Sequence, residues 1–515
     1  MNKMQSFILT VFSAALLVAA YPQTGWWLLA WIGLVPLLLA INGKKSIAGF
    51  WLSFLTGYLF FIGTLGWLVH VTYPGTFLLC AYLSLYVGFF ALAYQFFAPL
   101  SLIPRMLTRA AAWTVLEYTR SYLFTGFGWS LLGHSQCQNL WFVQMADITG
   151  VYGISFCIVL VNLLIAETIY CCVIARSVFQ RRSNPLTMTP SCNDKSLIIA
   201  WVMTAVLVMS AVGYGLWQLN TPRHWPTVKV GVIQPNIPQG LKWLPQMRTL
   251  IVDKHIELTH LFHDQALDLV VWPETSLPGI TSEAPDLVQS IKNTTQHERV
   301  PILYGAITQD GDRYYNSALL LSKQGQSAGQ YDKIHLVPFG EFLPLRPILG
   351  WINHFIGVED FASGTRYQLF DVGSHPKSAG VLICFEDTLG DLRRHVVDAG
   401  AQFWINMTND AWFGDTKEPF MHLQAAVIGC IENKRALVRS ANTGFSGFID
   451  PFGRIFSVVE NAKGKKTFIA GVAMAEVPLV DTKTFYTKYA DLFTFICFLG
   501  ILWAILLLTI RKRHA

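Results

Sequence analysis

The sequence has 515 residues, of which 53% are hydrophobic and only 14% are charged. Because soluble domains carry about 25% charged residues, this composition excludes an ordinary soluble protein. The formal net charge is +6. The basic residues stand in short clusters between apolar runs, which is typical of membrane topology and not of a nucleic-acid-binding surface. We therefore expect a polytopic α-helical membrane domain and no nucleic-acid partner.

Apolar runs close to the ~20 residues needed to cross a bilayer dominate both ends of the chain. The first run also resembles a secretory signal peptide, but a second apolar run follows after only four residues, which favours two membrane helices. Met106–Phe124 is the weakest candidate because Arg109, Glu117 and Arg120 interrupt it. About eight spans are predicted: Met1–Tyr21, Trp26–Ile41, Ile47–Val71, Thr76–Pro99, Met106–Phe124, Val151–Ala175, Leu197–Gln218 and Leu492–Ile510.

The basic residues predict how the chain crosses the membrane. If seven spans precede residue 221, all five basic clusters fall on one side, which the positive-inside rule makes cytoplasmic. The segment 221–489 then faces outward, between a membrane domain at 1–220 and a last helix with a basic tail at 490–515. The clusters are Lys3, Lys44–Lys45, Arg105 with Arg109, Arg176 to Arg182 with Lys195, and Arg511–Arg513.

The outward segment alternates strand-like and helical stretches, which favours an α/β layered domain. The expected strands are Val228–Ile237, Ala266–Thr275, Val300–Thr308, Tyr315–Ser322, Ser378–Asp387 and Gln402–Asp410. The expected helices are Gln246–Gln265, Ala284–His297 and Pro419–Ile431.

The stretch Val381–Asp387 (VLICFED) has the pattern of a buried strand that ends at Cys384. A single cysteine is most often a buried structural residue. The outward segment contains one further cysteine, Cys430. A disulfide between the two is one alternative, and an unpaired thiol with catalytic potential is the other. Two charged stretches upstream favour the catalytic interpretation.

Glu274 and Lys333 each accompany a strand-like run. Glu274 follows LVVWP and could serve as the base that a thiol needs, if burial raises its pKa; a solvated turn carboxylate is the alternative. Lys333 lies in QYDKIHLVPFGEFLP and could stabilise an oxyanion, although most lysines are surface residues. Glu341, eight positions later, could hold Lys333 or act as an acid or base. Otherwise it forms a surface ion pair of little energetic value.

Together these stretches resemble the Glu-Lys-Cys triad of the nitrilase superfamily, with WPE at Glu274, DKIHLVPFGE at Asp332–Glu341 and CFE at Cys384. The flanking membrane spans, one of them after the domain, resemble the apolipoprotein N-acyltransferase family. Many members have tyrosine after the cysteine, where this chain has Phe385, so no polar role is assigned there. Other stretches that look like the family are Lys242–Trp243, Asn409–Thr416 and Arg439–Gly447.

The resemblance implies a fold and a reaction. The outward domain would be a nitrilase-like αββα sandwich. Cys384, activated by Glu274, would attack an ester of a membrane phospholipid, with phosphatidylethanolamine as the expected donor, while Lys333 stabilises the oxyanion. The thioester would then acylate the α-amino group of the N-terminal cysteine of a diacylated prolipoprotein. This ping-pong scheme calls for no cofactor and no metal ion.

The resemblance also implies supporting residues and a location. Glu341 and Glu386 would act as supporting acids or orienting groups. The catalytic domain would lie on the periplasmic side of a bacterial cytoplasmic (inner) membrane, because lifting an acyl chain out of the lipid bilayer would cost roughly 10 kcal/mol or more. Aromatic residues that would contact substrate, with core packing as the alternative, are Trp243, Phe385, Trp412 and Phe413.

Two other functions fit parts of the sequence. A membrane-tethered nitrilase-type amidohydrolase would share the chemistry up to the thioester and use water as acceptor, but eight spans exceed what tethering needs. A transporter or sensor would display ionisable residues within its spans. In this chain few ionisable residues interrupt the predicted spans, and the exceptions are Glu117, Arg120, Asp147 and Glu167.

Overall fold

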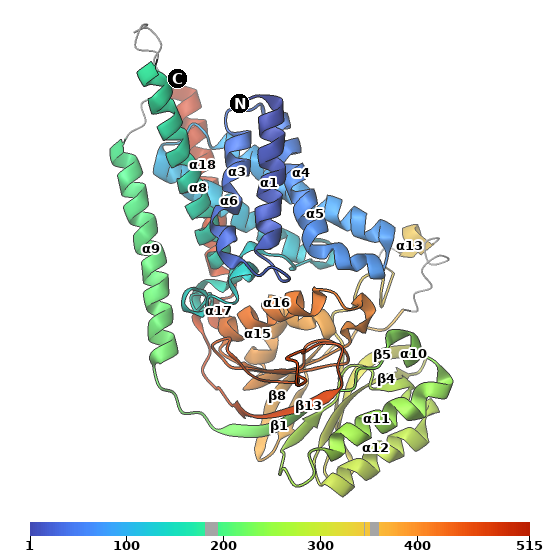
Figure 1. Ribbon diagram of the computed structural model, residues 1–515. Coiled ribbons are helices and arrows are strands. Elements are labelled where there is room, and N and C mark those ends of the chain that lie inside the picture. Colours follow the sequence, from blue (N-terminus) through green and yellow to red (C-terminus); the bar gives the residue numbers. More distant parts are fainter. Residues whose placement is uncertain (181–193, 344–345, 351–359, 515) are drawn as a thin grey trace. The chain divides into compact units, whose positions relative to one another are not determined.

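The protein is described from a computed structural model, which covers residues 1–180, 194–343, 346–350 and 360–514 (Figure 1). The chain forms two compact units. The first comprises Met1–Thr221 and Asp491–Ala515, and the second comprises Pro222–Ala490. Arg181 and Arg182 of one predicted basic cluster lie outside the described residues.

The first unit is a bundle of helices. Its first helix packs within the bundle, since the Thr56 hydroxyl on α4 donates to the Thr10 carbonyl on α1 at 3.2 Å. The last helix, α18, packs against α6 and α8 although most of the chain separates them in sequence (Figure 1). The helices are α1 (Lys3–Ala19), α2 (Ala30–Gly33), α3 (Val35–Ile41), α4 (Ser46–Leu65), α5 (Tyr73–Phe96), α6 (Leu102–Tyr122), α7 (Leu140–Val143), α8 (Ala146–Gln180), α9 (Asp194–Asn220) and α18 (Leu492–His514).

Each of the eight predicted spans contains a helix, but these helices differ in length and hydropathy, and therefore in whether they could cross a membrane. Two are shorter apolar helices, at Lys3–Ala19 and Trp27–Ile41. The helix α6 is long enough, but its charged residues set it apart from the apolar spans. Five helices are both long and apolar enough: Ser46–His70, Tyr73–Phe96, Ala146–Val173, Lys195–Asn220 and Leu492–Arg513.

The ionisable residues within the predicted spans that the sequence singles out have partners inside the unit. Arg109 of α6 donates to Glu167 of α8 at 3.1 Å. Glu117 accepts a backbone N–H at 2.8 Å, and Arg120 donates to three backbone carbonyl oxygens at 2.8–3.0 Å. Asp147 accepts hydrogen bonds from a tyrosine hydroxyl and a glutamine amide on α9. Polar groups inside a membrane bundle need such partners. The contacts of Arg109 and Asp147 join neighbouring helices, whereas Glu117 and Arg120 bind the backbone of the segment 127–132 that follows α6.

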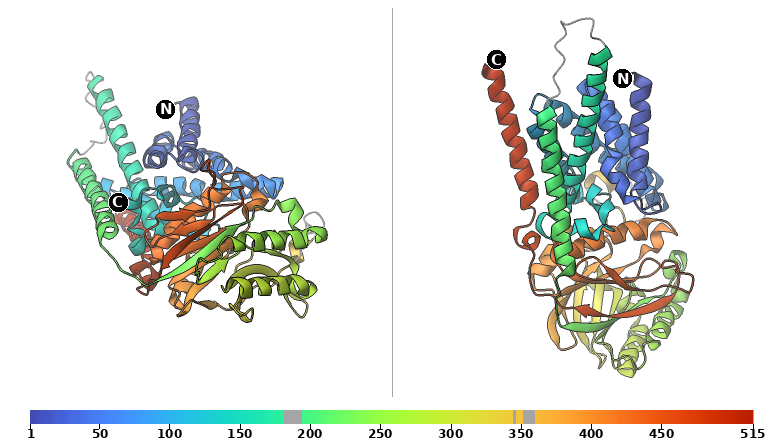
Figure 2. Two further views of the ribbon diagram at one scale, coloured as in Figure 1. Left: turned by 60° about the horizontal axis from the view of Figure 1, so that its bottom comes forward. Right: turned by 60° about the vertical axis from the view of Figure 1, so that its left-hand side comes forward.

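The second unit contains two β-sheets (Figures 1 and 2). The seven-stranded sheet has the order β13-β1-β2-β4-β5-β6, with β3 paired to β4, and the six-stranded sheet has the order β12-β11-β10-β9-β8-β7. The strands of the first sheet are β1 (Thr227–Gln234), β2 (Leu269–Val271), β3 (Leu277–Ile280), β4 (Ile302–Asp310), β5 (Arg313–Leu321), β6 (Ser327–Asp332) and β13 (Gly471–Pro478). Those of the second are β7 (Leu369–Val372), β8 (His375–Ile383), β9 (Phe403–Thr408), β10 (Ala436–Ala441), β11 (Gly447–Ile449) and β12 (Ile455–Val458).

The two sheets pack face to face, and helices cover their outer faces. On β8, Val381 and Ile383 enter the core between the sheets, whereas Leu382 packs on the outside against α15, as the two-residue period of a strand requires. The outer face of the first sheet is covered by α11 and α12. The result is an αββα sandwich. Its helices are α10 (Gln239–Lys242), α11 (Arg248–His260), α12 (Pro285–Glu298), α13 (Arg346–Leu349), α15 (Gly390–Asp398), α16 (Glu418–Asn433) and α17 (Phe485–Tyr489).

The two cysteines of this unit are not joined. Cys384 is a free thiol that directly follows β8, and Cys430 is a free thiol buried in α16. The alternative of a disulfide between them is therefore wrong. Cys384 remains available as an unpaired thiol.

Candidate active site

Three strands of the sandwich end shortly before the residues that the sequence singles out. Glu274 follows β2, Lys333 follows β6 and Cys384 follows β8. β2 and β4 are parallel, and β5 is antiparallel to both β4 and β6. β6 therefore runs in the same direction as β2, and both leave the first sheet at the same edge. The carboxyl ends of parallel strands are the usual place for a ligand site in α/β folds.

The Lys333 ammonium is the central charge of this edge. Its side chain is 1% exposed, and its Nζ lies 2.9 Å from Glu341 and 3.9 Å from Glu274 Oε1. Burial alone would favour the neutral amine, but the pKa of Lys333 is raised because Glu341, Cys384 and Glu274 favour the charged form. Lys333 is therefore a fixed positive charge at neutral pH.

Glu274 is buried and held from two sides. Its Oε1 accepts a hydrogen bond from Asn316 Nδ2 on β5 at 2.7 Å, and the same amide donates to Glu341 at 2.9 Å. Its backbone carbonyl accepts from the buried Lys242 Nζ at 2.9 Å. Burial raises the pKa of Glu274, with the Glu341 charge adding to it and Lys333 opposing. A carboxylate whose pKa is shifted toward neutrality is suited to accept a proton.

Gly305 on β4 allows the Glu274 loop to lie against the sheet. A Cβ at this position would come within 2.4 Å of the Thr275 nitrogen and 2.8 Å of the Glu274 Cα. The loop is also tied to β4 by a hydrogen bond from the Ser276 hydroxyl to the Gly305 carbonyl at 3.1 Å. The place of Glu274 therefore depends on a position where no side chain larger than hydrogen fits.

Cys384 has a strained backbone conformation. Its φ is +56°, a left-handed conformation that is uncommon for residues other than glycine. The turn begins immediately after β8 and presents a partly buried thiol. Burial raises the pKa of Cys384, the Glu274 charge adds to this and Lys333 opposes it. The residue is thus a thiol at neutral pH and needs a base to become a nucleophile.

Glu386 ties the lysine loop to the cysteine strand. One of its oxygens accepts the backbone N–H groups of Ile334 and His335 at 2.8 and 2.9 Å, and the other accepts that of Ile383 at 2.7 Å. The hydroxyl of Tyr331 also donates to it. Burial raises the pKa of Glu386 to about 7. Its backbone partners lie on both the lysine loop and the cysteine strand, so Glu386 links the two segments that carry Lys333 and Cys384.

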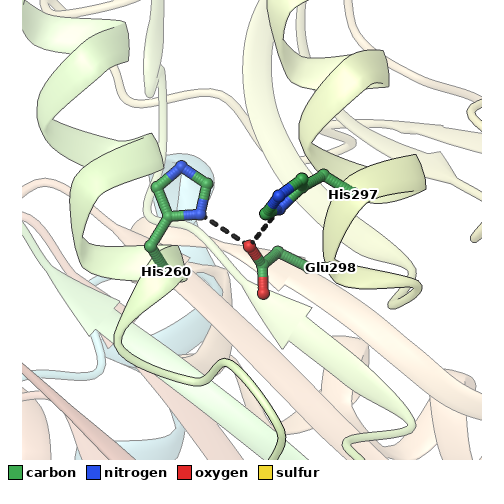
Figure 3. A group of neighbouring side chains, drawn as sticks. All are labelled: His260, His297 and Glu298. Carbon is green, nitrogen blue, oxygen red and sulfur yellow. Dashed lines mark hydrogen bonds and ion pairs between the residues drawn. The ribbon is translucent and has the colours of Figure 1, made fainter.

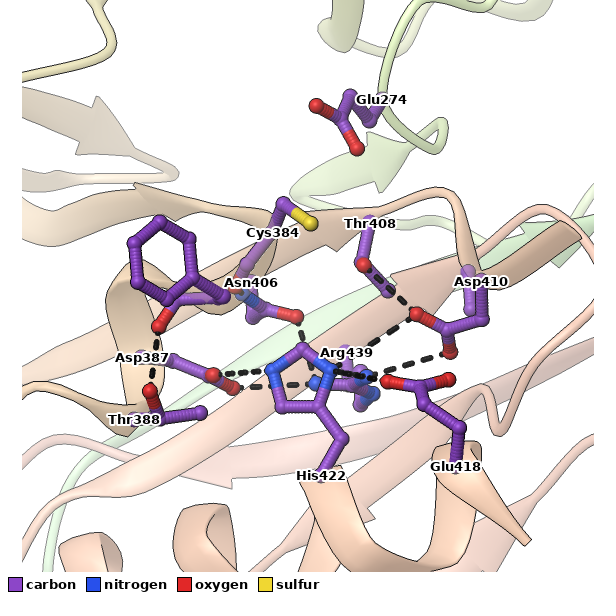
Figure 4. Close-up of polar contacts among 12 residues, drawn as sticks. Glu274, Cys384, Asp387, Thr388, Asn406, Thr408, Asp410, Glu418, His422 and Arg439 are labelled. Carbon is purple, nitrogen blue, oxygen red and sulfur yellow. Dashed lines mark hydrogen bonds and ion pairs between the residues drawn. The ribbon is translucent and has the colours of Figure 1, made fainter. Parts of the chain in front are cut away.

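A buried charge network supports the cysteine turn from the outer side of the second sheet (Figure 4). Asn406 on β9 donates to the Cys384 carbonyl at 2.8 Å, and Arg439 on β10 donates to Asn406 Oδ1 at 2.7 Å. The same guanidinium lies 3.1 Å from Asp387 and 3.3 Å from Asp410. Arg439, together with His422, outweighs burial and lowers the pKa of Asp410 to about 2. The network fixes the carbonyl of the strained residue.

The four predicted aromatic contacts lie in different settings. Trp243 and Trp412 are 43% and 50% exposed. Phe413 is partly buried next to Trp412. The ring centre of Phe385 lies 5.8 Å from Lys333 Nζ and 5.4 Å from the His335 ring. Phe385 is therefore placed directly beside the Lys333 ammonium.

Several residues of the site were not predicted. The sequence marks Lys242 only as part of the pair Lys242–Trp243, yet this lysine donates to the backbone carbonyl of Glu274. Arg439 stands out in the sequence only as the start of a stretch that resembles the family, and Asp387 only as the end of VLICFED. No sequence pattern marks Asn316 as a residue of the site, because its contacts with Glu274 and Glu341 depend on which strands pair.

The sequence matches known proteins along most of its length. Residues 13–164 match the apolipoprotein N-acyltransferase N-terminal domain, and residues 229–485 match the carbon-nitrogen hydrolase domain. An apolipoprotein N-acyltransferase of Geobacter metallireducens is 34% identical over 514 residues, which cover 96% of this chain and 94% of the relative. This chain belongs to the apolipoprotein N-acyltransferase family.

One further relative and one solved structure are also similar to this chain. The apolipoprotein N-acyltransferase of Methylococcus capsulatus is 30% identical over 479 residues, which cover 88% of each chain. Among solved structures, an amidase of the nitrilase superfamily from Nesterenkonia AN1 is 14% identical, with a TM-score of 0.38, and covers 50% of this chain and 93% of that one. The apolipoprotein N-acyltransferase relatives thus include both the helical unit and the sandwich.

Replacing Arg439 by leucine is expected to destabilise the sandwich by about 3–5 kcal/mol, because it removes the guanidinium that lies beside two buried carboxylates, Asp387 and Asp410. The measurement is thermal or denaturant unfolding of the detergent-solubilised protein. The matched control is Arg454→Leu, since Arg454 is 48% exposed and lies 3.9 Å from Asp450. That surface pair is expected to contribute less than about 1 kcal/mol. Equal losses in the two variants would contradict the assigned role of the network.

Replacing Gly305 by alanine is expected to displace the Glu274 loop and to lower acyl transfer by about 100-fold, while the protein stays folded. The measurement is the rate of acyl transfer at saturating substrate, with circular dichroism to check the fold. Gly213→Ala is the control, because nothing lies within 4 Å of the added Cβ at that glycine. An unchanged rate in Gly305→Ala would mean that the loop position does not limit the reaction.

Proposed function

We propose that this protein is an apolipoprotein N-acyltransferase that carries the acyl chain as a thioester on Cys384. The observation that supports this most directly is the convergence of a thiol, a buried carboxylate and a buried ammonium at three strand ends, in a chain of this family. A covalent carrier divides the transfer into two steps, each with its own electrophile.

In the first step, Glu274 accepts the proton of the Cys384 thiol, and the sulfur attacks the ester carbonyl of a phospholipid. The carbonyl oxygen becomes negative in the tetrahedral intermediate, where the Lys333 ammonium stabilises it. The carbon–oxygen bond then breaks, and the lysophospholipid alkoxide takes the proton from Glu274. The products of this step are a thioester and a lysophospholipid.

In the second step, the α-amino group of the N-terminal cysteine of a diacylated lipoprotein attacks the thioester. Glu274 accepts the amine proton, and Lys333 again stabilises the oxyanion. The carbon–sulfur bond breaks, the thiolate regains the proton from Glu274, and an amide is formed. Glu341 and Asn316 take no proton in this scheme. They keep the lysine and the glutamate at fixed positions through the contacts of 2.7–2.9 Å described above.

The lipid substrates suggest the location of the reaction. We place the segment 221–489 on the periplasmic side of a bacterial inner membrane, with 1–220 and 490–515 in the membrane, because the basic clusters then face the cytoplasm. Phosphatidylethanolamine is the proposed donor. The exposed side chains of Trp243 and Trp412 are proposed to contact acyl chains or the bilayer interface, together with Phe413 and Phe385.

Intact-mass spectrometry tests the two steps separately. The purified protein is incubated with phosphatidylethanolamine vesicles, and an acyl mass is expected on the wild-type chain, mapping to Cys384 after proteolysis. A synthetic diacylated lipopeptide is then added, and the acyl mass is expected to pass to its amino group. Cys384→Ala is expected to remain folded, to carry no acyl mass and to yield no acylated lipopeptide.

Two results would contradict the proposal. N-acylation of the lipopeptide by Cys384→Ala would exclude the thioester. Discharge of the acyl enzyme by water at the same rate with and without lipopeptide would indicate a hydrolase. A lipopeptide acetylated at its amino group serves as the matched control, since it fills the acceptor site but offers no nucleophile.

A further inference from the structure

Two neighbouring helices of the sandwich end in histidines. His260 is the last residue of α11 and His297 is the next-to-last residue of α12. The strands that follow these helices, β2 and β4, are parallel neighbours, and α11 and α12 lie side by side on the outer face of their sheet (Figure 1). Both helices therefore present their carboxyl ends at the same place. The partial negative charge of a helix carboxyl end favours a cation.

The side chains at these two ends converge on one carboxylate (Figure 3). His260 Nδ1 and His297 Nδ1 lie 2.6 and 2.7 Å from Oε1 of Glu298. A third imidazole, that of His263, places its Nδ1 3.0 Å from Oε2 of the same residue. The Glu298 side chain is only 4% exposed, whereas the three imidazoles are 46–66% exposed. The carboxylate is thus fixed beneath rings that solvent can reach.

We propose that His260, His297 and Glu298, assisted by His263, form a binding site for a late first-row divalent cation, for which we take zinc. Imidazole nitrogen and carboxylate oxygen are its usual ligands. The candidate ligand atoms of the first three residues all lie within 4.8 Å of one another. Tetrahedral zinc separates its ligands by about 3.4 Å, which exposed imidazoles reach by small rotations of their side chains.

The site differs from the other group of potential ligands in the described part of the chain. Asp410, Glu418 and His422 also lie close together. However, the Arg439 guanidinium lies 2.8 Å from His422 Nδ1 and 3.3 Å from Asp410 Oδ2, so a fixed cation already fills that space (Figure 4). No arginine or lysine contacts the Glu298 carboxylate among the ion pairs of the described residues. The negative charge of Glu298 can therefore be balanced either by a protonated imidazole or by a metal ion.

The proposed metal would join the carboxyl ends of α11 and α12. These two helices cover the outer face of the sheet whose strand β2 leads to Glu274. The site lies outside the group of residues that hold the thiol, the carboxylate and the lysine, so zinc is expected to act on stability and not on the reacting atoms. A ligand that binds only the folded state raises the unfolding temperature.

The test uses the full chain in detergent without a histidine tag, treated with EDTA and then freed of it. Isothermal titration with zinc chloride is expected to give one ion per chain with micromolar affinity. Titration with cobalt chloride is expected to give the visible absorption bands of a four-coordinate ion. His260→Ala and His297→Ala are each expected to weaken zinc binding at least tenfold and to abolish the zinc-dependent rise in unfolding temperature.

His224→Ala is the matched control, because His224 is an exposed histidine of the same unit that belongs to neither ligand group. It is expected to bind zinc as the wild type does. Binding of the same strength in the His260→Ala/His297→Ala double variant would overturn the proposal. So would the absence of zinc binding by the folded wild type, which would leave only a hydrogen-bonded cluster. Acyl transfer by the double variant is measured separately and is expected to be unchanged.

Discussion

The site depends on the balance of charge around one buried lysine. An ammonium group removed from water is costly unless anions surround it. Here Glu341 lies 2.9 Å from Lys333 Nζ and Glu274 Oε1 lies 3.9 Å away, and Asn316 links the two carboxylates. The Glu341 carboxylate, which is closer, balances the positive charge of Lys333. In the proposed mechanism Glu274, which is farther away, exchanges the proton. This difference in distance separates an orienting glutamate from a candidate base.

The second requirement is a rigid support for the cysteine. A residue with φ of +56° keeps that conformation only if its surroundings hold it. Asn406 holds the Cys384 carbonyl, and Arg439 holds Asn406. These contacts follow from the sheet register, in which Leu382, Asn406 and Arg439 stand opposite one another on β8, β9 and β10. Their side chains therefore project from the same face of the sheet, behind the turn.

Local sequence pattern accounts for part of this structure. Apolar runs predicted the strands that end near Glu274 and Cys384, because a buried strand needs a continuous apolar stretch. The strand β10 was not predicted because ALVRSA contains a buried arginine and a buried serine, whose hydrogen-bond partners, among them Asn406 on β9 and the Ile233 carbonyl on β1, lie far away in the sequence. Asn316 and Lys242 escaped for the same reason: they reach Glu274 from positions 42 and 32 residues away in the chain. Sequence patterns predict where strands end, whereas contacts across the site depend on how strands pair.

The most direct test of the account is the pH dependence of the first step. Rapid mixing with phospholipid, acid quenching and mass spectrometry give the rate at which the acyl enzyme forms. Since the pKa of Glu274 is raised and the base must be deprotonated, the rate is expected to rise with pH to a plateau. Glu274→Gln is expected to lower that plateau by at least 100-fold. An unchanged rate and pH profile in Glu274→Gln would contradict the assignment of Glu274 as the base for Cys384.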